Sequence, residues 1–236
     1  EGDVDALTSA HAPASVTRVS EEEALSVEGA FDDIVYFGAN AGVIEKIAQL
    51  LASRGVLNVV LGGRRIERKV SLDIGRVHYD FIRFVGTTGD DPAEGYAWIP
   101  DTGDLRVGDK IAIVGAAGPM GQMHTMRAVT SDVPGISVVG TDLSDERLAG
   151  LKAVVGPVAE KRGVPLSIIN TSVTPLEYGY THITCLVPVP ALVAGAVDLA
   201  AEGAIINAFA GIPAGTFGDF DLQGIIERHI FMLGTS

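Results

Sequence analysis

The chain has 236 residues, of which 47% are hydrophobic and 20% charged, so it can bury a core and is not disordered by composition. Its formal net charge of −13 argues against nucleic acids and anionic membranes as partners, because both are negatively charged. The single cysteine, Cys185, excludes an internal disulfide and fits a reducing compartment, so we expect a cytoplasmic protein. We expect Cys185 to be a small buried apolar side chain rather than a nucleophile.

The sequence shows neither a recognisable signal peptide at its start nor an uninterrupted apolar stretch long enough for a membrane span. The first residues are acidic, whereas a signal peptide would need basic ones. Residues 185–201 are strongly apolar, but Pro188, Pro190 and Asp198 interrupt them, which argues against a membrane span. Because the sequence has no initiator methionine and stops abruptly, we expect it to be a fragment of a longer protein.

The first hundred residues predict a partly regular segment. A strand is expected over residues 14–19, and the acidic run at residues 21–23 is expected to open a short helix on a solvated face. Strands are predicted over residues 34–37, 56–61 and 81–85, and a helix over residues 41–53, where apolar residues recur at helical spacing. Residues 90–108 are rich in Asp, Gly and Pro and form the connection to the next part.

The central stretch, residues 110–142, has the layout of a dinucleotide-binding unit. A strand over residues 110–114 ends in a glycine loop, a helix follows to about Val129, and a second strand over residues 136–140 leads to Asp142. The glycine spacing is Gly-x-x-Gly-x-x-Gly, a variant of the usual fingerprint. The competing interpretation is a structural β-α-β unit whose crevice binds nothing.

Each residue type in this loop has a physical reason. Gly115 permits a tight turn at positive φ, Gly118 lets the backbone approach a diphosphate, and Gly121 lets the helix pack closely on the strand. Pro119 suits the first helical turn, where its missing N–H costs nothing. The free amides of that turn, together with the helix dipole, favour a bound phosphate.

Asp142 is the residue that predicts a preference for NAD over NADP. It follows Gly121 by 21 residues, close to the spacing expected for a carboxylate that binds the ribose hydroxyls. The same carboxylate would repel a 2′-phosphate, so NAD is expected and NADP is disfavoured.

The rest of the chain completes a Rossmann sheet. Ser144 is a predicted N-cap for a helix that runs past Leu151, and a further helix begins near Ala191. Strands are predicted over residues 166–169, 183–187, 204–209 and 230–233. Counted from Lys110, this makes six strands with helices between most of them. The predicted fold class is therefore α/β, a doubly wound parallel sheet.

An internal repeat governs the interpretation of the first segment. Residues 31–88 and 180–236 share one pattern, so we expect residues 1–100 to be a duplicated second half of the Rossmann fold and residues 101–236 to be a complete NAD-binding domain. The matched pairs, at an offset of 149 and then 148 residues, are Ile34/Ile183, Leu50/Leu199, Asn58/Asn207, Gly62/Gly211, Asp73/Asp221, Gly86/Gly234 and Thr87/Thr235.

A second glycine-containing loop, Gly38 to Gly42, allows a different interpretation. It follows a strand, opens a helix and is followed by Arg64 and Arg65, which is typical of an NADP site. The repeat argues against such a site, because Gly38 aligns with Val187, after the fourth strand. The four basic residues there are then expected to form a solvated turn; they are Arg64, Arg65, Arg68 and Lys69.

Several segments of the chain resemble the cofactor domain of the medium-chain dehydrogenase/reductases. The carrying segments lie at residues 105–111, 114–121 and 141–148 and at the closing Gly-Thr-Ser of residues 234–236. Residues 187–193 and 207–211 resemble the branch of zinc-type polyol and sugar-phosphate dehydrogenases, including sorbose-phosphate reductase-like proteins. Residues 31–89 resemble the C-terminal half of the same domain.

The resemblance implies an NAD-dependent enzyme that transfers hydride between the nicotinamide and an alcohol or carbonyl substrate. In that family zinc is held by Cys, His and Glu of a separate catalytic domain, which is missing here, so no catalytic or metal residue is assigned. The resemblance places Arg147 near the adenosine, with a surface role as the alternative. It places the nicotinamide beside the residues that follow the fourth and fifth strands, which are Val187, Pro188, Ala210 and Gly211, and beside Thr235. The expected cofactor residues are Gly115, Gly118, Pro119, Met120, Gly121, Asp142, Leu143, Arg147, Val187, Pro188, Ala210 and Gly211.

Two further functional classes fit the same sequence. A non-catalytic nucleotide-binding or assembly module and an S-adenosylmethionine-dependent methyltransferase remain open, whereas a short-chain dehydrogenase is disfavoured because no Tyr-x-x-x-Lys occurs. The family pairs its last strands across a twofold axis. We therefore expect residues 81–85 and 230–233 to pair as a homo-oligomer or as a pseudo-dimer within the chain.

Overall fold

The computed structural model describes residue 17, residues 19–27 and residues 30–234, so most of the strand expected over 14–19, as well as Thr235, lies outside the described residues. The described part is an α/β structure. Its helices are α2 (Glu21–Ser26), α3 (Ala41–Ala48), α4 (Ile74–Tyr79), α5 (Pro92–Ala97), α6 (Pro119–Thr130), α7 (Asp145–Arg162), α8 (Pro190–Leu199) and α9 (Leu222–Glu227). Its strands are β1 (Phe31–Phe37), β2 (Leu51–Val60), β3 (Val70–Asp73), β4 (Arg83–Thr87), β5 (Lys110–Val114), β6 (Ser137–Asp142), β7 (Leu166–Asn170), β8 (Tyr180–Cys185), β9 (Ala200–Ala208), β10 (Phe217–Phe220) and β11 (Phe231–Leu233).

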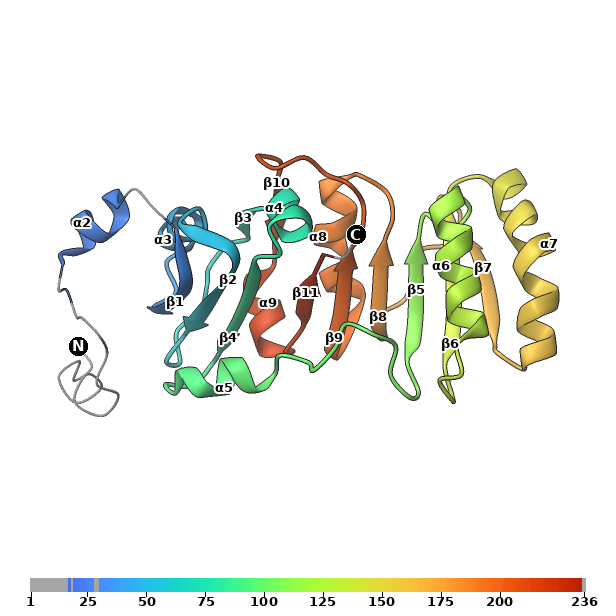
Figure 1. Cartoon of the computed structure of the whole chain (residues 1–236), viewed down its shortest axis with the longest axis horizontal. Coiled ribbons are helices and arrows are strands. Elements are labelled where there is room, and N and C mark those ends of the chain that lie inside the picture. Colours follow the sequence, from blue (N-terminus) through green and yellow to red (C-terminus); the bar gives the residue numbers. More distant parts are fainter. Residues whose placement is uncertain (1–16, 18, 28–29, 235–236) are drawn as a thin grey trace.

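The second part of the chain forms a six-stranded sheet with the order β11-β9-β8-β5-β6-β7 (Figure 1). Every neighbouring pair in this sheet is parallel. The order reverses direction at β5, since one half of the chain builds outward through β6 and β7 and the other through β8, β9 and β11. This confirms the predicted Rossmann-like sheet, in which ligands bind beyond the carboxyl ends of the strands at the reversal point.

The apolar strands of this sheet are buried on both faces, as parallel strands require. Within β5, Ile111 and Ile113 pack into the cluster that includes Leu148 and Leu151 of α7. Ala112, which points the other way, packs into the larger cluster that extends to the first segment. The loops at the carboxyl ends of the central strands are therefore attached to strands that are packed on both faces.

The first segment forms its own three-stranded parallel sheet with the order β1-β2-β4. The helix predicted over residues 41–53 is wrong at its C-terminal end, because α3 stops at Ala48. Leu51 is buried and pairs with Phe31 in the sheet. An apolar pair such as Leu50 and Leu51 fits helix and strand spacing equally over so short a run, and sheet pairing decides the outcome.

Two short strands that were not predicted connect the segments. β3 pairs with β10 in antiparallel fashion, so that Val70 lies opposite Phe220 and Asp73 lies opposite Phe217. Ser71 lies opposite Asp219 in the middle of this ladder. The strands expected to pair, over residues 81–85 and 230–233, do not pair within the described chain, because β4 and β11 belong to separate sheets. They meet through side chains instead, since Val85 of β4 packs with Phe231 and Leu233 of β11.

Irregular backbone features recur in the two segments at the residue offsets of the predicted repeat. The β1–β2 register shifts between Phe31 and Asp33, and the β8–β9 register shifts between Tyr180 and His182, each 149 residues later. Positive φ values recur at the same offsets. Arg54 has φ of 68° and Gly203, 149 residues later, has φ of 65°. Phe81 has φ of 56° and His229, 148 residues later, has φ of 52°.

Candidate functional site

A cleft of about 550 Å³ opens at the carboxyl ends of β5, β6 and β8, at the reversal point of the sheet. Ten of the twelve predicted cofactor residues line it, namely Gly115, Gly118, Pro119, Met120, Gly121, Asp142, Leu143, Arg147, Val187 and Pro188. Six lining residues were not predicted: Val114, Thr141, Ser144, Thr171, Leu186 and Leu192. Thr171 and Leu186 directly follow β7 and β8, so the parallel topology was the signal that could have found them.

The glycine loop is shaped so that larger residues would not fit. Gly115 has φ of +85°, and a Cβ there would lie 2.5 Å from the Val187 side chain. A Cβ on Gly121 would clash with the carbonyl oxygen of Gly115 and the backbone of Ala116. A Cβ on Gly118 would lie 3.3 Å from Nη2 of Arg147. The loop therefore presents bare backbone to the cleft, as a diphosphate-binding loop requires.

The helix that begins at this loop has no side-chain cap. Gly118 is the N-cap of α6, Pro119 occupies its first turn, and the first helical bond runs from the N–H of Gln122 to the oxygen of Gly118. The amides of Met120 and Gly121 precede that bond and have no helical acceptor. They lie at the cleft, at the positive end of the helix dipole, where an anion is favoured.

This uncapped start is unusual within the molecule. Among the eight helices in the described residues, six have a side-chain oxygen that accepts a bond from their first turn; the caps are Ser20, Asn40, Asp73, Asp91, Ser144 and Asp221. The two exceptions are α6 and α8. Both begin at the cleft, since Pro119 and Leu192 line it.

Asp142 stands at the rim of the cleft, at the end of β6. Its Oδ1 accepts the backbone N–H groups of Leu143 (2.9 Å) and Ser144 (3.3 Å), which fix the carboxylate in place. Its Oδ2 pairs with Nη2 of Arg147 at 3.2 Å. The Asp142 side chain is 8% exposed and that of Arg147 is 55% exposed, so the guanidinium is the member of the pair that faces solvent.

Ala210 and Gly211 do not line the cleft. The N–H of Ala210 donates to the oxygen of Cys185 at 3.0 Å, which holds the end of β9 beside the end of β8. Gly211 instead faces Tyr79 of α4. Their role toward a nicotinamide stays a prediction.

A different hollow, of about 840 Å³, surrounds the loop from Gly38 to Gly42 that allowed an NADP interpretation. Arg64, Arg65 and Arg68 line it. Arg65 pairs with Glu227, and Arg68 pairs with Glu45 and lowers the pKa of that carboxyl to about 2. Asn40 caps α3, which starts there. Nη1 of Arg64 donates to the oxygen of Leu61 at 3.4 Å. All three arginines at this hollow, and the capped amide of Val43, are thus already engaged by protein groups.

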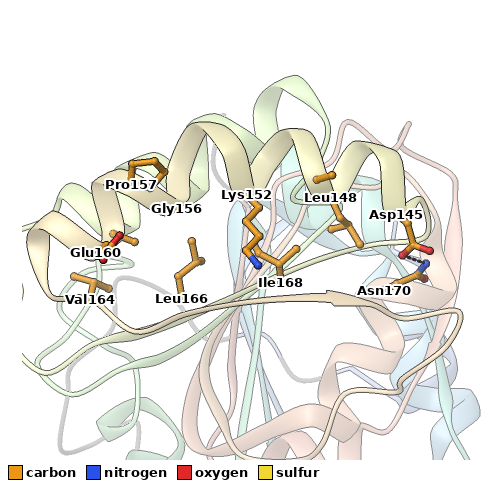
Figure 2. A pocket seen from close by; sticks show the side chains of 12 residues that line it. Asp145, Leu148, Lys152, Gly156, Pro157, Glu160, Val164, Leu166, Ile168 and Asn170 are labelled. Carbon is orange, nitrogen blue, oxygen red and sulfur yellow. Dashed lines mark hydrogen bonds between the residues drawn. The ribbon is translucent and has the colours of Figure 1, made fainter.

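A third hollow, of about 600 Å³, lies between α7 and the edge strand β7 (Figure 2). In Figure 2, Ile168 of the strand lies near Lys152 and Leu148 of the helix, and Leu166 lies below Gly156. Nδ2 of Asn170 donates to Asp145 at 2.8 Å at one end. No predicted site residue belongs to this hollow.

Other reactive groups lie apart from the cleft. Cys185 is fully buried, and burial raises the pKa of its thiol to about 12, which agrees with the expected apolar role. Within residues 17, 19–27 and 30–234, no group of three or more His, Cys, Asp or Glu side chains is arranged to hold a metal ion. No helix in this part of the chain has the length and apolar character needed to cross a membrane.

Comparison with known proteins gave partial similarities. The chain matches no protein-family model. The uncharacterized protein YggP of Escherichia coli K12 is 30% identical over 145 residues, which cover 56% of this chain and 34% of that protein. The chain therefore spans about a third of the length of this curated relative.

Solved structures of several oxidoreductases are similar to the same share of the chain. Acetophenone reductase of Geotrichum candidum, solved with NAD, is 18% identical with a TM-score of 0.41, and the match covers 56% of this chain and 35% of that protein. Benzyl alcohol dehydrogenase of Acinetobacter calcoaceticus is 16% identical with a TM-score of 0.44, covering 57% and 36%. L-idonate 5-dehydrogenase of Escherichia coli is 15% identical with a TM-score of 0.42, covering 55% and 35%.

Proposed function

We propose that this chain is the NAD-binding portion of an alcohol or polyol dehydrogenase, with sugar phosphates among its candidate substrates. The observation that carries the proposal is the start of α6. Its first amides lack a side-chain cap and belong to residues that line a cleft, and Gly115 and Gly121 leave no room for a Cβ. Such a cradle suits a diphosphate.

Each part of the cofactor has a matching group in the cleft. The amides of Met120 and Gly121 would hold the diphosphate, and Asp142 would accept hydrogen bonds from the ribose hydroxyls. The exposed guanidinium of Arg147 would lie close to both. Leu143 and Leu192 offer apolar surface at the rim. The negative charge of Asp142 disfavours the 2′-phosphate of NADP.

The bound cofactor would supply the hydride chemistry, which the protein directs by binding and orientation. The contribution of the chain is to fix the diphosphate and one ribose, because two anchors orient the attached nicotinamide. By resemblance to the zinc-type dehydrogenases, a zinc-holding domain from elsewhere in a longer protein would supply the substrate site.

One observation favours NAD over S-adenosylmethionine as the ligand. A methyltransferase also uses a glycine loop and an acidic residue, but S-adenosylmethionine has no diphosphate. S-adenosylmethionine would offer the two uncapped amides at α6 a single carboxylate, whereas NAD offers them a doubly charged diphosphate, which such amides favour more strongly. A non-catalytic nucleotide-binding module would use the same cleft and differs only in lacking turnover.

We further propose that residues 31–88 are a duplicated half of the same fold and that they pair with residues 180–234 as a pseudo-dimer within the chain. The β3–β10 ladder supports this arrangement. At the repeat offset of 148 residues, Val70 corresponds to Gly218 and Leu72 corresponds to Phe220. A local twofold axis through the Ser71–Asp219 pair therefore exchanges the pair Val70–Phe220 with the pair Gly218–Leu72. Reciprocal contacts also fit it: a Cβ on Gly86 would touch Ile226, and one on Gly234 would touch His78.

Calorimetric titration tests the proposed ligand. We expect NAD and ADP-ribose to bind with 1:1 stoichiometry, NADP to bind more weakly, and S-adenosylmethionine not to bind. Gly118→Asp places a carboxylate in the cradle and should abolish nucleotide binding, whereas Gly150→Ala on the exposed face of α7 should not. Binding of S-adenosylmethionine in place of NAD would overturn the proposal. Reduction of NAD in the presence of a polyol panel, followed by absorbance, would separate an enzyme from a binding module.

A further inference from the structure

Four rings form a continuous row at the carboxyl end of β9. The ring of His124 in α6 meets Phe209 edge-on at 4.5 Å between centroids, and Phe209 lies 6.4 Å from His78. His78 in turn meets Tyr79 edge-on at 4.6 Å. The row joins α6, which starts at the glycine loop, to α4, which belongs to the first segment.

This row begins one helical turn from the cleft and ends beside Gly211, which the resemblance assigns to the nicotinamide. His124 is one helical turn beyond Met120, which lines the cleft. Phe209 directly precedes Ala210, whose N–H is bonded to Cys185, and the next residues of that chain segment, Leu186 to Pro188, line the cleft. The rings therefore extend away from the cradle along the ends of β8 and β9.

His78, inside the row, is held by a contact with the backbone, whereas Tyr79, at the end of the row, is exposed to solvent. His78 is buried, and its Nδ1 lies 3.0 Å from the oxygen of Ala208, so the strand end holds this ring in place. Burial, together with the charge of Arg127, lowers the pKa of the His124 imidazole, whose ring packs against Phe209. Tyr79 is 56% exposed, and no residue in the described part of the chain accepts or donates a bond at its hydroxyl.

Tyr79 lies directly against one of the residues predicted to contact the nicotinamide. A Cβ placed on Gly211 would be 3.1 Å from the Tyr79 hydroxyl oxygen, so glycine at this position leaves the hydroxyl open. An exposed aromatic ring with a free hydroxyl, next to bare backbone, offers a stacking face and a hydrogen-bonding group to a flat amide-bearing ring.

We propose that Tyr79 contacts the nicotinamide riboside half of the bound cofactor, so that the first segment supplies a specificity residue to the cofactor site of the second. This inference rests on the proposed NAD function. It gives α4 a role beyond packing, since α4 delivers the one exposed ring of the row.

Comparison of NAD with ADP-ribose, which lacks the nicotinamide, tests this contact. We expect Tyr79→Ala to weaken NAD binding about five- to tenfold and to leave ADP-ribose binding within about twofold of wild type. Tyr79→Phe should give a smaller loss for NAD. The matched control is Tyr178→Ala, because Tyr178 is 59% exposed and lies before β8, at the opposite end of the strand.

The possible outcomes are distinct. Equal loss of both ligands in Tyr79→Ala, or no loss of either, would overturn the contact while leaving the NAD function in place. If the wild-type chain binds neither ligand, the NAD function fails and this inference fails with it.

Discussion

Nη2 of Arg147 lies 3.2 Å from Oδ2 of Asp142, and the same nitrogen would lie 3.3 Å from a Cβ on Gly118. One guanidinium thus spans the distance between the carboxylate expected to bind ribose and the loop expected to bind phosphate. It neutralises Asp142 while the nucleotide is absent. If ribose hydroxyls bond to the carboxylate, as proposed, the exposed guanidinium is close enough to the loop to contact the diphosphate, so we expect the two residues to act as a coupled pair.

Replacing Asp142 should change cofactor choice. In Asp142→Ala, NAD loses its hydrogen bonds to a carboxylate, and we expect its affinity to fall about ten- to a hundredfold. NADP should lose little, because the repelling charge has gone, so the preference for NAD should shrink. Titration calorimetry with both nucleotides measures this, and Glu146→Ala on the exposed start of α7 is the control. An unchanged NAD/NADP ratio would refute the assigned role of Asp142.

Replacing Arg147 should weaken the phosphate side of the site. We expect Arg147→Met to reduce affinity for ADP-ribose about fivefold at low ionic strength and to make that affinity less sensitive to salt, because a screened charge pair is lost. Titrations at two salt concentrations check both effects. A steeper salt dependence in the variant than in wild type would contradict a phosphate-facing guanidinium.

Two glycine-to-alanine changes should act in opposite directions on stability. Gly121→Ala forces a Cβ against the Gly115 oxygen and should cost about 2 kcal/mol or more of unfolding free energy. Gly150→Ala lies inside α7 with open space around it and should raise stability by about 1 kcal/mol through helix propensity. Urea denaturation measures both. A Gly121→Ala variant as stable as wild type would mean that α6 can move away from β5.

The buried thiol of Cys185 predicts a loss of stability at alkaline pH. Its folded-state pKa is raised to about 12 by burial, above the unfolded value of about 8.5. The resulting stabilisation is fully present below the unfolded pKa and is lost as pH rises from there toward the folded pKa. Cys185→Ala should flatten this part of the stability curve, measured by denaturation between about pH 7 and pH 10. Fast reaction of the native thiol with a disulfide reagent at pH 8 would contradict its burial.

The pseudo-dimer proposal predicts a monomer in solution. Because β3 and β10 already pair within the chain, light scattering should give 24.5 kDa. A mass twice as large, unchanged on dilution, would mean that another surface mediates assembly. The exposed edge strands β1 and β7 would then be the first surfaces to change.

The glycine loop and Asp142 could be predicted because their signal is local. Strand, loop, helix and acid follow one another within residues 110–142, and each residue type has one physical reason at its position. The β3–β10 ladder could not be predicted in this way, since it joins two four-residue strands far apart in the sequence. The same holds for Tyr79, which reaches Gly211 only through tertiary packing.

The end of α3 shows the limit of periodicity. Leu50 and Leu51 continue the helical pattern, but Leu51 is the first residue of β2 and pairs with Phe31. The oxygen of Leu50 accepts the N–H of Phe31, so this residue also bonds to β1. The lining residues Leu186 and Thr171 represent an intermediate case. Their side chains have no chemical signature, yet both follow strands that end at the crevice.

A crystal structure of the chain soaked with NAD tests the central claim most directly. The account predicts diphosphate oxygens within hydrogen-bonding distance of the amides of Met120 and Gly121, and ribose hydroxyls bonded to Asp142. Nucleotide bound in the hollow beside Gly38 and Arg64, with the α6 amides left in contact with solvent, would contradict it.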